Sequence, residues 1–175
     1  MASVLVAGGC GFIGSHVVDR LLARHDVGEL CVVDNLWTGL QDNIAHIDDR
    51  RLTFVQADVE HFRPDRRFDE IYHLASPASP PWYMAAPLRT ISANVCGALN
   101  LAGLVDEGGL LAYTSTSEVY GDPLVSPQPE SYRGYVDCTG PRSSYDESKR
   151  CVESLLFEAQ RVHGMRVKVA RLFNV

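Results

Sequence analysis

The chain has 175 residues, 46% of them hydrophobic, which suits one globular domain with a substantial core. Its formal net charge is −6 and its 16 basic residues are scattered, which argues against nucleic acid or a membrane surface as a partner. The five cysteines are widely spaced without a C-x-x-C pair, so we expect reduced thiols in a cytoplasmic protein and no metal site. The first apolar run is too short for a signal peptide, and no 18-residue apolar stretch exists, so we expect neither export nor a membrane span.

Short aliphatic runs alternate with longer helical patterns along the chain. We expect strands at Val4–Ala7, Leu30–Val33, Leu52–Val55, Glu70–Leu74, Leu110–Thr114 and Val167–Leu172. We expect helices at Ile13–Ala23, Leu88–Val105 and Ser144–His163, the last ended by Gly164, and loops at Ser76–Pro81 and Pro123–Pro141. Strands that are almost continuously hydrophobic are typical of a parallel sheet covered on both faces. The pattern predicts an α/β fold with a Rossmann-type doubly wound parallel sheet, forming one domain over residues 1–175.

A glycine cluster, Gly8-Gly9-Cys10-Gly11-Phe12-Ile13-Gly14, follows the first strand and opens the first helix. Such glycines let a pyrophosphate approach backbone N–H groups at a helix N-terminus, although the cluster alone could be an ordinary tight turn. Asp34 favours the first interpretation, because it ends the second strand about 20 residues later, where a carboxylate accepts bonds from the adenosine ribose. A carboxylate there would repel a 2′-phosphate, and Asn35 and Leu36 offer no arginine. We therefore predict NAD rather than NADP.

Further cofactor contacts are expected at the ends of the first four strands. Asp58 and Val59 follow the third strand and could contact the adenine, while an ordinary helix cap is the alternative for Asp58. The complete predicted cofactor site consists of Gly8, Gly11, Phe12, Ile13, Gly14, Asp34, Asn35, Thr38, Gly39, Asp58, Val59, Leu74, Ala75, Ser76, Tyr145 and Lys149.

The candidate catalytic residues follow the fifth strand and open the last helix. The segment Ser115–Gly121 places hydroxyls and the Glu118 carboxylate at the rim of the predicted sheet. Tyr145 and Lys149 are four residues apart and share a helix face. A nearby Lys149 cation would lower the pKa of Tyr145, making it a base near neutral pH, and could also bind a nicotinamide ribose. For this spacing alone a chance pair is the alternative, and the glycine cluster and the polar strand end favour an active site.

Three segments carry a resemblance to a known family. Thr114–Gly121, His73–Pro81 and Tyr145–Arg150 resemble UDP-glucuronate decarboxylases, also called UDP-xylose synthases, within the extended short-chain dehydrogenase/reductase superfamily. The similarity runs from Val4 to Val175. Related 4,6-dehydratases usually have Asp-Glu where this chain has Ser117-Glu118, and 4-epimerases lack the acid. Within the superfamily, the motif therefore favours decarboxylation.

The resemblance implies an NAD-dependent, redox-neutral conversion of UDP-glucuronate to UDP-xylose through a 4-keto intermediate, with internal return of the hydride. In this scheme Tyr145, assisted by Thr116 and Lys149, takes the proton of the sugar 4-hydroxyl. Glu118 would assist proton transfer or orient the sugar ring, with Ser117 positioning it, and a mere surface carboxylate is the alternative for Glu118.

Three residues are candidate contacts for the UDP-sugar. Asn174 lies in an Arg-x-Phe-Asn signature of the family, and Arg89 could bind a carboxylate or pyrophosphate. Tyr83 is the third. The alternatives are that Arg89 is a solvated helix residue and that Tyr83 packs beneath the proline-rich loop.

Family members continue for well over a hundred residues past the position of Val175, into a small substrate domain. The resemblance thus implies a fragment or a truncated relative without the C-terminal substrate domain, with weak or no turnover alone and exposed apolar surface. A homodimer through the two long helices is usual for the superfamily. Another nucleotide-sugar 4-epimerase or 4,6-dehydratase, and a catalytically silent NAD-binding module, remain the alternatives.

Overall fold

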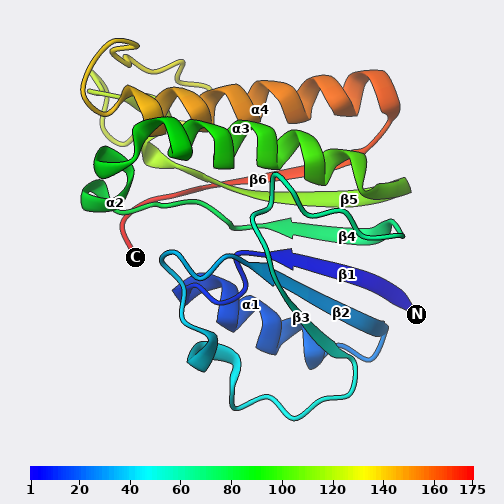
Figure 1. The fold of residues 1–175 in the computed structure, drawn as a ribbon. Helices are drawn as coiled ribbons and strands as arrows, with labels where there is room; N and C mark the ends of the chain where they lie inside the picture. Colours follow the sequence, from blue (N-terminus) through cyan, green and yellow to red (C-terminus); the bar gives the residue numbers. More distant parts are fainter.

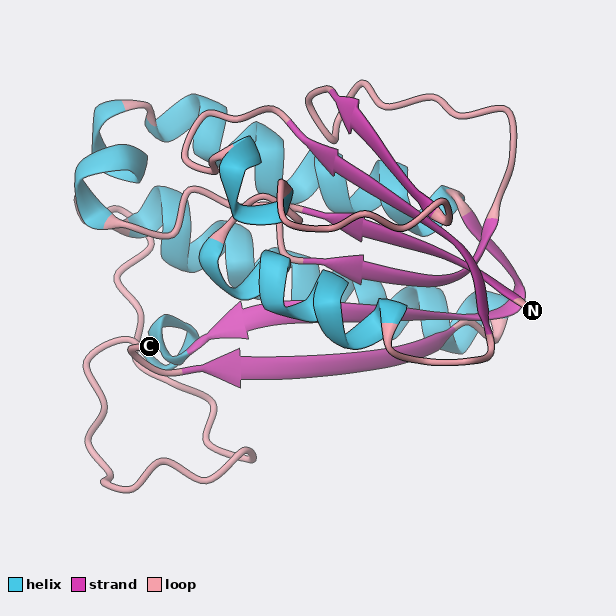
Figure 2. Ribbon diagram, turned by 90° about the horizontal axis from the view of Figure 1, so that it is seen from below, coloured by secondary structure: helices cyan, strands magenta, loops and turns pink.

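Six parallel strands form one sheet in the computed structural model, which describes residues 1–175 (Figure 1). Its order is β3-β2-β1-β4-β5-β6, and the strand arrowheads all point the same way (Figure 2). The chain moves outward from β1 in one direction and from β4 in the other, so a crevice is expected at their carboxyl ends. The predicted Rossmann-type sheet is confirmed. The strands are β1 (Ala2–Ala7), β2 (Val27–Asp34), β3 (Leu52–Gln56), β4 (Phe68–His73), β5 (Val105–Thr116) and β6 (Arg166–Leu172).

Helices cover both faces of this sheet. Helix α1 (Phe12–Leu22) lies on one face, and α3 (Pro87–Gly103) and α4 (Ser143–His163) lie side by side on the other (Figure 1). The three predicted helices are therefore present, and α4 ends at Gly164 as predicted, with the left-handed φ of +67° that favours glycine there. No helix is both long and apolar enough to cross a membrane.

The central strand β1 shows why the strands are almost continuously hydrophobic. Val4 and Val6 belong to the apolar cluster beneath α1, whereas Leu5 and Ala7 belong to the cluster on the α3 and α4 side. All four residues are fully buried. Burying a Val or Leu side chain contributes roughly 1.5–3 kcal/mol, so both faces of β1 anchor the sheet.

Two segments differ from the sequence-based expectation. Residues Pro80–Ala85, partly within the predicted proline loop, form a short helix α2, because proline suits the first turn of a helix. Val105 was expected to end the preceding helix but begins β5, since that helix already ends at Gly103. Two 3₁₀ turns, η1 (Gln41–Ile44) and η2 (Ser117–Tyr120), were not predicted.

Candidate active site

The turn between β1 and α1 packs tightly against the end of β4. Gly8 has a φ of +83°, and a Cβ atom there would lie 2.5 Å from the backbone nitrogen of Ala75. A Cβ atom on Gly14 would lie 2.0 Å from the carbonyl oxygen of Gly8. No side chain caps the amino end of α1. Its first N–H groups therefore have no side-chain partner and can receive an anion such as a pyrophosphate.

Asp34 connects the end of β2 to this glycine turn. The residue is 7% exposed, and its carboxylate accepts the Cys10 N–H at 3.0 Å and the Leu36 N–H at 2.9 Å. Leu36 has a φ of +59°, uncommon for a residue other than glycine, and its bond to Asp34 holds this turn. A carboxylate offers about four acceptor positions, so Asp34 can still accept ribose hydroxyls while it organises the turn.

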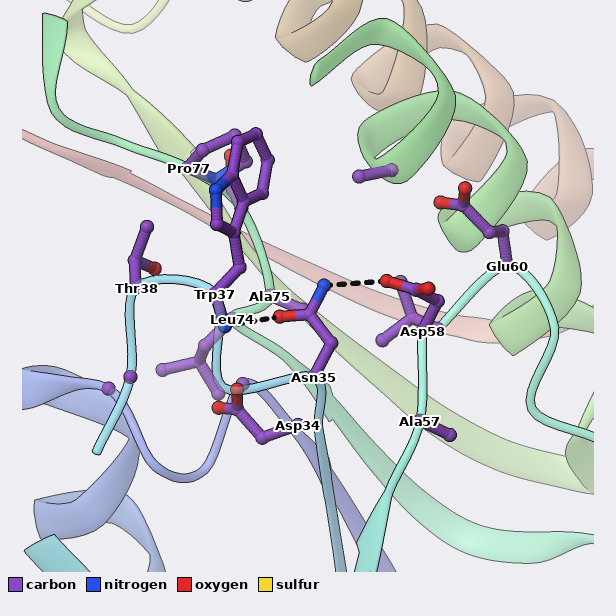
Figure 3. Close-up of a pocket in the computed structure, with 16 residues that line it drawn as sticks. Asp34, Asn35, Trp37, Thr38, Ala57, Asp58, Glu60, Leu74, Ala75 and Pro77 are labelled. Carbon is purple, nitrogen blue, oxygen red and sulfur yellow. Dashed lines mark hydrogen bonds between the residues drawn. The ribbon is translucent and has the colours of Figure 1, made fainter. Parts of the chain in front are cut away.

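A polar network lines the part of the cleft that follows β2 and β3 (Figure 3). The Asn35 amide donates to Asp58 at 2.6 Å and accepts the Trp37 N–H at 2.9 Å. Arg89, on α3, pairs with Asp58 at 3.4 Å, and its guanidinium carbon lies 4.0 Å from the centre of a Trp37 ring. No helix begins after Asp58, so it does not cap one. Its carboxylate belongs instead to the network that lines the cleft.

The other part of the cleft lies at the carboxyl ends of β5 and β6 and holds a cavity of about 470 Å³. The two parts share lining residues, so they form one continuous cleft; the shared residues are Gly8, Gly11, Thr38, Leu74 and Ser76. Every predicted cofactor residue lines one part or both. Thr116, Ser117 and Asn174 line the second part together with Tyr145 and Lys149.

Tyr145 and Lys149 lie on the buried side of the first turns of α4. They are 6% and 3% exposed, respectively. The Lys149 Nζ donates to the carbonyl oxygen of Thr114 at 2.9 Å and lies 5.7 Å from the centre of the Tyr145 ring. Burial lowers the pKa of Lys149 to about 7. The amine can therefore change its charge near neutral pH.

The expectation of a lowered pKa for Tyr145 is not met in this structure. Burial, against the opposing effect of the nearby Thr116 hydroxyl, raises the pKa of Tyr145 to about 12. Lys149 does not lower the pKa of Tyr145 as expected, because its amine is directed to the carbonyl oxygen of Thr114 and burial makes its charge easy to lose. The buried carboxyl of Asp146 also has a pKa raised by burial, to about 6, although Arg142 opposes the shift.

Glu118 lies in η2, where its N–H donates to the Thr116 hydroxyl at 3.2 Å. Its carboxylate forms an ion pair with Arg142, directly before α4, and does not line the 470 Å³ cavity. Arg142 was not predicted from the sequence. Its position three residues before Tyr145, at the start of the same helix, was the available signal. The pair joins the end of β5 to the helix that carries Tyr145.

Two of the three candidate substrate contacts are placed away from the cavity walls. Tyr83 is 1% exposed and its ring stacks on Tyr145, which agrees with the packing alternative. Arg89 is exposed but contacts Asp58 and Trp37, in the part of the cleft farther along the sheet from Tyr145. Only Asn174 lines the cavity beside Tyr145.

A partly buried ion pair holds the strand ends beneath the site. Arg171, on β6, donates to the Glu153 carboxylate of α4 at 2.7 and 3.0 Å, and to the Tyr120 hydroxyl at 2.9 Å. The Ser115 hydroxyl donates to the same carboxylate at 2.5 Å. Burial alone would raise the pKa of Glu153, but these hydrogen bonds bring it below its usual value. The arginine of the Arg-x-Phe-Asn segment therefore has a structural role.

The fold and this cleft define a dinucleotide-binding domain of the Rossmann type with a tyrosine and lysine pair beside the cofactor region. Residues 4–175 match the model of the NAD dependent epimerase/dehydratase family, and the chain belongs to that family.

Its relatives include named decarboxylases. UDP-glucuronic acid decarboxylase 5 of Arabidopsis thaliana is 48% identical over 98% of this chain and 50% of its own length. UDP-glucuronic acid decarboxylase 1 of Xenopus tropicalis is 46% identical over 98% of the chain and 40% of its own length. The chain is thus a homologue of these decarboxylases and spans about half the length of the curated relatives it matches.

Solved structures of the same fold have related activities. UDP-N-acetylglucosamine 4-epimerase from Methanobrevibacter ruminantium has a TM-score of 0.82 and 29% identity, over 97% of this chain and 54% of the other. The dTDP-glucose 4,6-dehydratase from Streptomyces venezuelae, solved with NAD bound, has a TM-score of 0.81 and 30% identity, over 96% and 54%.

Proposed function

We propose that this protein carries the cofactor-binding and proton-transfer part of an NAD-dependent decarboxylase that converts UDP-glucuronate to UDP-xylose. The observation that carries the proposal is that Thr116, Tyr145 and Lys149 line one cleft with the glycine turn. The 48% identity to an Arabidopsis UDP-glucuronic acid decarboxylase supports this substrate over other nucleotide sugars.

The residues of the cleft fit NAD. Gly8 and Gly14 leave no room for a side chain where backbone N–H groups would hold the pyrophosphate. Asp34 would accept the adenosine ribose hydroxyls, and its negative charge disfavours a 2′-phosphate. Asp58 would lie toward the adenine, and Lys149 would donate to the nicotinamide ribose. NAD, when bound, supplies a hydride acceptor and donor.

Tyr145 is the proposed base for the sugar 4-hydroxyl. Its raised pKa keeps the phenol protonated near pH 7, so it needs a neighbouring cation to act as a base. Lys149, with Nζ 5.7 Å from the ring centre, is the neighbouring amine that can carry this charge. The Thr116 hydroxyl, at the end of β5, would hydrogen-bond to the Tyr145 hydroxyl and assist it in taking the proton of the sugar 4-hydroxyl.

Decarboxylation follows from a ketone at carbon 4 of the sugar. This ketone makes the carboxylate a β-keto acid, whose carbon–carbon bond breaks as carbon dioxide leaves and the electron pair moves into an enolate. A proton must then be added at carbon 5. We propose that Glu118, oriented by Arg142, assists this proton transfer or orients the sugar ring, and that Ser117 positions the ring.

Product analysis tests the proposal and separates it from its alternatives. The longest form of the protein that its gene encodes is incubated with NAD and a panel of UDP- and dTDP-sugars, and products are identified by mass spectrometry. UDP-xylose from UDP-glucuronate is expected. UDP-galacturonate would indicate a 4-epimerase, a 4-keto-6-deoxy sugar would indicate a dehydratase, and NAD binding without any product would indicate a silent module.

A further inference from the structure

The aromatic ring of Tyr83 lies flat against the ring of Tyr145. Their centroids are 4.8 Å apart and their planes differ by 10°. Tyr83 comes from α2, the short helix after β4, whereas Tyr145 is in the first turn of α4. The two rings are 1% and 6% exposed, so each shields the other from solvent.

The short helix α2 presents this one ring to the protein interior. Tyr83 is its only buried residue, while its neighbours Trp82 and Met84 are 47% and 50% exposed. Pro80 and Pro81 begin the helix, and the Tyr83 N–H donates to the Ser79 carbonyl at 3.1 Å. The proline-rich start of α2 thereby holds the Tyr83 ring, its single inward side chain, against the ring of Tyr145.

The ring of Tyr83 makes this contact, not its hydroxyl. The Tyr83 Oη is buried and makes no hydrogen bond to Tyr145; the charged group that faces it is the Arg142 guanidinium, directly before α4. Removing the hydroxyl should therefore leave the stack intact, whereas removing the ring would expose one face of Tyr145. The other titratable or polar groups around Tyr145 are Tyr113 and Thr116 on β5, Glu118 on η2, and Asp146 and Lys149 on α4. Arg142, directly before α4, faces Tyr83, Glu118 and Asp146.

We propose that Tyr83 is a positioning residue, whose ring fixes the plane of the Tyr145 ring and excludes water from its face. The consequence for catalysis rests on the proposed function, because it requires Tyr145 to be the base. The stack itself is independent of any substrate. This role differs from a direct substrate contact by Tyr83, since no atom of Tyr83 lines the cavity.

The test measures the titration of Tyr145 by carbon-13 NMR of the tyrosine ring carbons, with its signal assigned by its absence in Tyr145→Phe. Tyr83→Leu should lower the pKa of Tyr145 by roughly one unit, a tenfold larger acid dissociation constant, because water reaches the ring. Tyr83→Phe should shift the titration much less than Tyr83→Leu, because it removes only the hydroxyl and keeps the ring, and Met84→Leu on the exposed side of α2 should keep the parent titration. An unchanged titration in Tyr83→Leu, or equal shifts in Tyr83→Leu and Tyr83→Phe, would overturn the proposal.

A second measurement covers the case in which Tyr83→Leu does not fold. Nuclear Overhauser contacts between the ring protons of Tyr83 and Tyr145 are expected in the unaltered protein, and their absence would contradict the stack. Neither NMR measurement uses turnover, so a failure of the proposed function leaves the result interpretable.

Kinetics then separate positioning from substrate contact. If the longest form releases carbon dioxide from UDP-glucuronate, Tyr83→Leu should lower kcat roughly tenfold with little change in KM, and Tyr83→Phe should recover most of that loss. A Tyr83→Phe variant with a raised KM and unchanged kcat would instead assign the hydroxyl to substrate binding and overturn the proposal.

Discussion

Glu118 is the residue that we propose for proton transfer, and its carboxylate pairs with Arg142 at the start of α4. Glu118→Gln keeps the size of the side chain but removes both the proton-transfer group and the ion pair. We expect carbon dioxide release from UDP-glucuronate by the longest form to fall roughly 100-fold. Glu107→Gln, an exposed residue near the start of β5 and so at the other end of the strand that leads to Glu118, is the matched control. Unchanged release by Glu118→Gln would remove Glu118 from the mechanism.

His73 is a buried histidine whose two ring nitrogens have no hydrogen-bond partner. It ends β4, is 0% exposed, and lies beside Tyr113 with ring centroids 5.3 Å apart. Burial, with a smaller contribution from the Lys149 charge, lowers its pKa from 6.5 to about 3. Above pH 6.5 the ring is neutral in both the folded and the unfolded chain, so protonation of His73 does not affect stability there. Between pH 6.5 and pH 3 only the unfolded chain binds the proton, so the free energy of unfolding falls as the pH falls.

This shift predicts an acid-sensitive stability. Between pH 7 and pH 5 the free energy of unfolding should fall about 2 kcal/mol more in the parent than in His73→Leu, because protonation then favours the unfolded chain. Urea unfolding at the two pH values measures the difference. His61→Gln, an exposed histidine, should behave like the parent. Equal pH dependence in the parent and His73→Leu would show that the buried ring does not carry the effect.

Three elements meet at the Glu153 carboxylate, which joins α4 to the ends of β5 and β6. Arg171→Met would leave that carboxylate without its main partner in a largely buried place. We expect the free energy of unfolding to fall by roughly 2–4 kcal/mol, since Arg171 is partly exposed. Arg161→Met breaks a surface pair with Glu158 and should change stability by less than about 1 kcal/mol. Similar losses in both variants, measured by denaturant unfolding, would contradict a structural role for the network.

The regular elements were predictable because their signals are local. Almost continuous hydrophobic runs predicted all six strands, and the spacing of apolar residues predicted α1, α3 and α4 to within two residues at each end. Helix α2 was missed because a proline cluster reads as a loop unless its place in the first helical turn is recognised. Its stabilising contact, Tyr83 on Tyr145, joins residues 62 positions apart and leaves no local pattern.

The site was predictable where it depends on backbone shape and less so where it depends on side-chain pairing. The glycine turn and Asp34 follow from spacing along strands, and the structure brings them to one cleft. The Arg142 pair with Glu118 and the Arg89 contact with Trp37 depend on loop paths that sequence periodicity does not encode. The pKa of Tyr145 was also misjudged, because burial raises it, and the Lys149 amine is directed to the Thr114 carbonyl oxygen.

At the scale of the whole molecule, α3 and α4 leave apolar side chains exposed. Leu88, Ile91 and Leu99 on α3 are 80%, 40% and 56% exposed, and Val162 on α4 is 70% exposed. Such surface is typical of association between protein chains. We predict a homodimer through these helices, measured as a mass near twice 19.3 kDa by light scattering. Leu99→Glu should shift the protein toward the monomer, and a monomer at all concentrations in the parent would contradict this prediction.

The length of the chain bears on its activity, because it spans about half of its curated relatives. Every predicted cofactor residue lines the cleft, whereas Phe173 and Val175, which line the cavity beside Tyr145, are 57% and 85% exposed. We therefore expect the 175-residue chain to bind NAD, measured by calorimetry, and to turn over UDP-glucuronate weakly or not at all. Robust formation of UDP-xylose by this chain would show that the cavity needs no further cover.

The most direct test follows carbon dioxide from UDP-glucuronate labelled with carbon-14 in its carboxylate. The longest form encoded by the gene is given NAD and the labelled substrate, beside a Tyr145→Phe variant whose NAD binding is checked by calorimetry. We expect labelled carbon dioxide from the parent and a loss of at least roughly 100-fold in Tyr145→Phe. A parent that binds NAD but releases no label, or a Tyr145→Phe variant that releases it equally fast, would contradict the account.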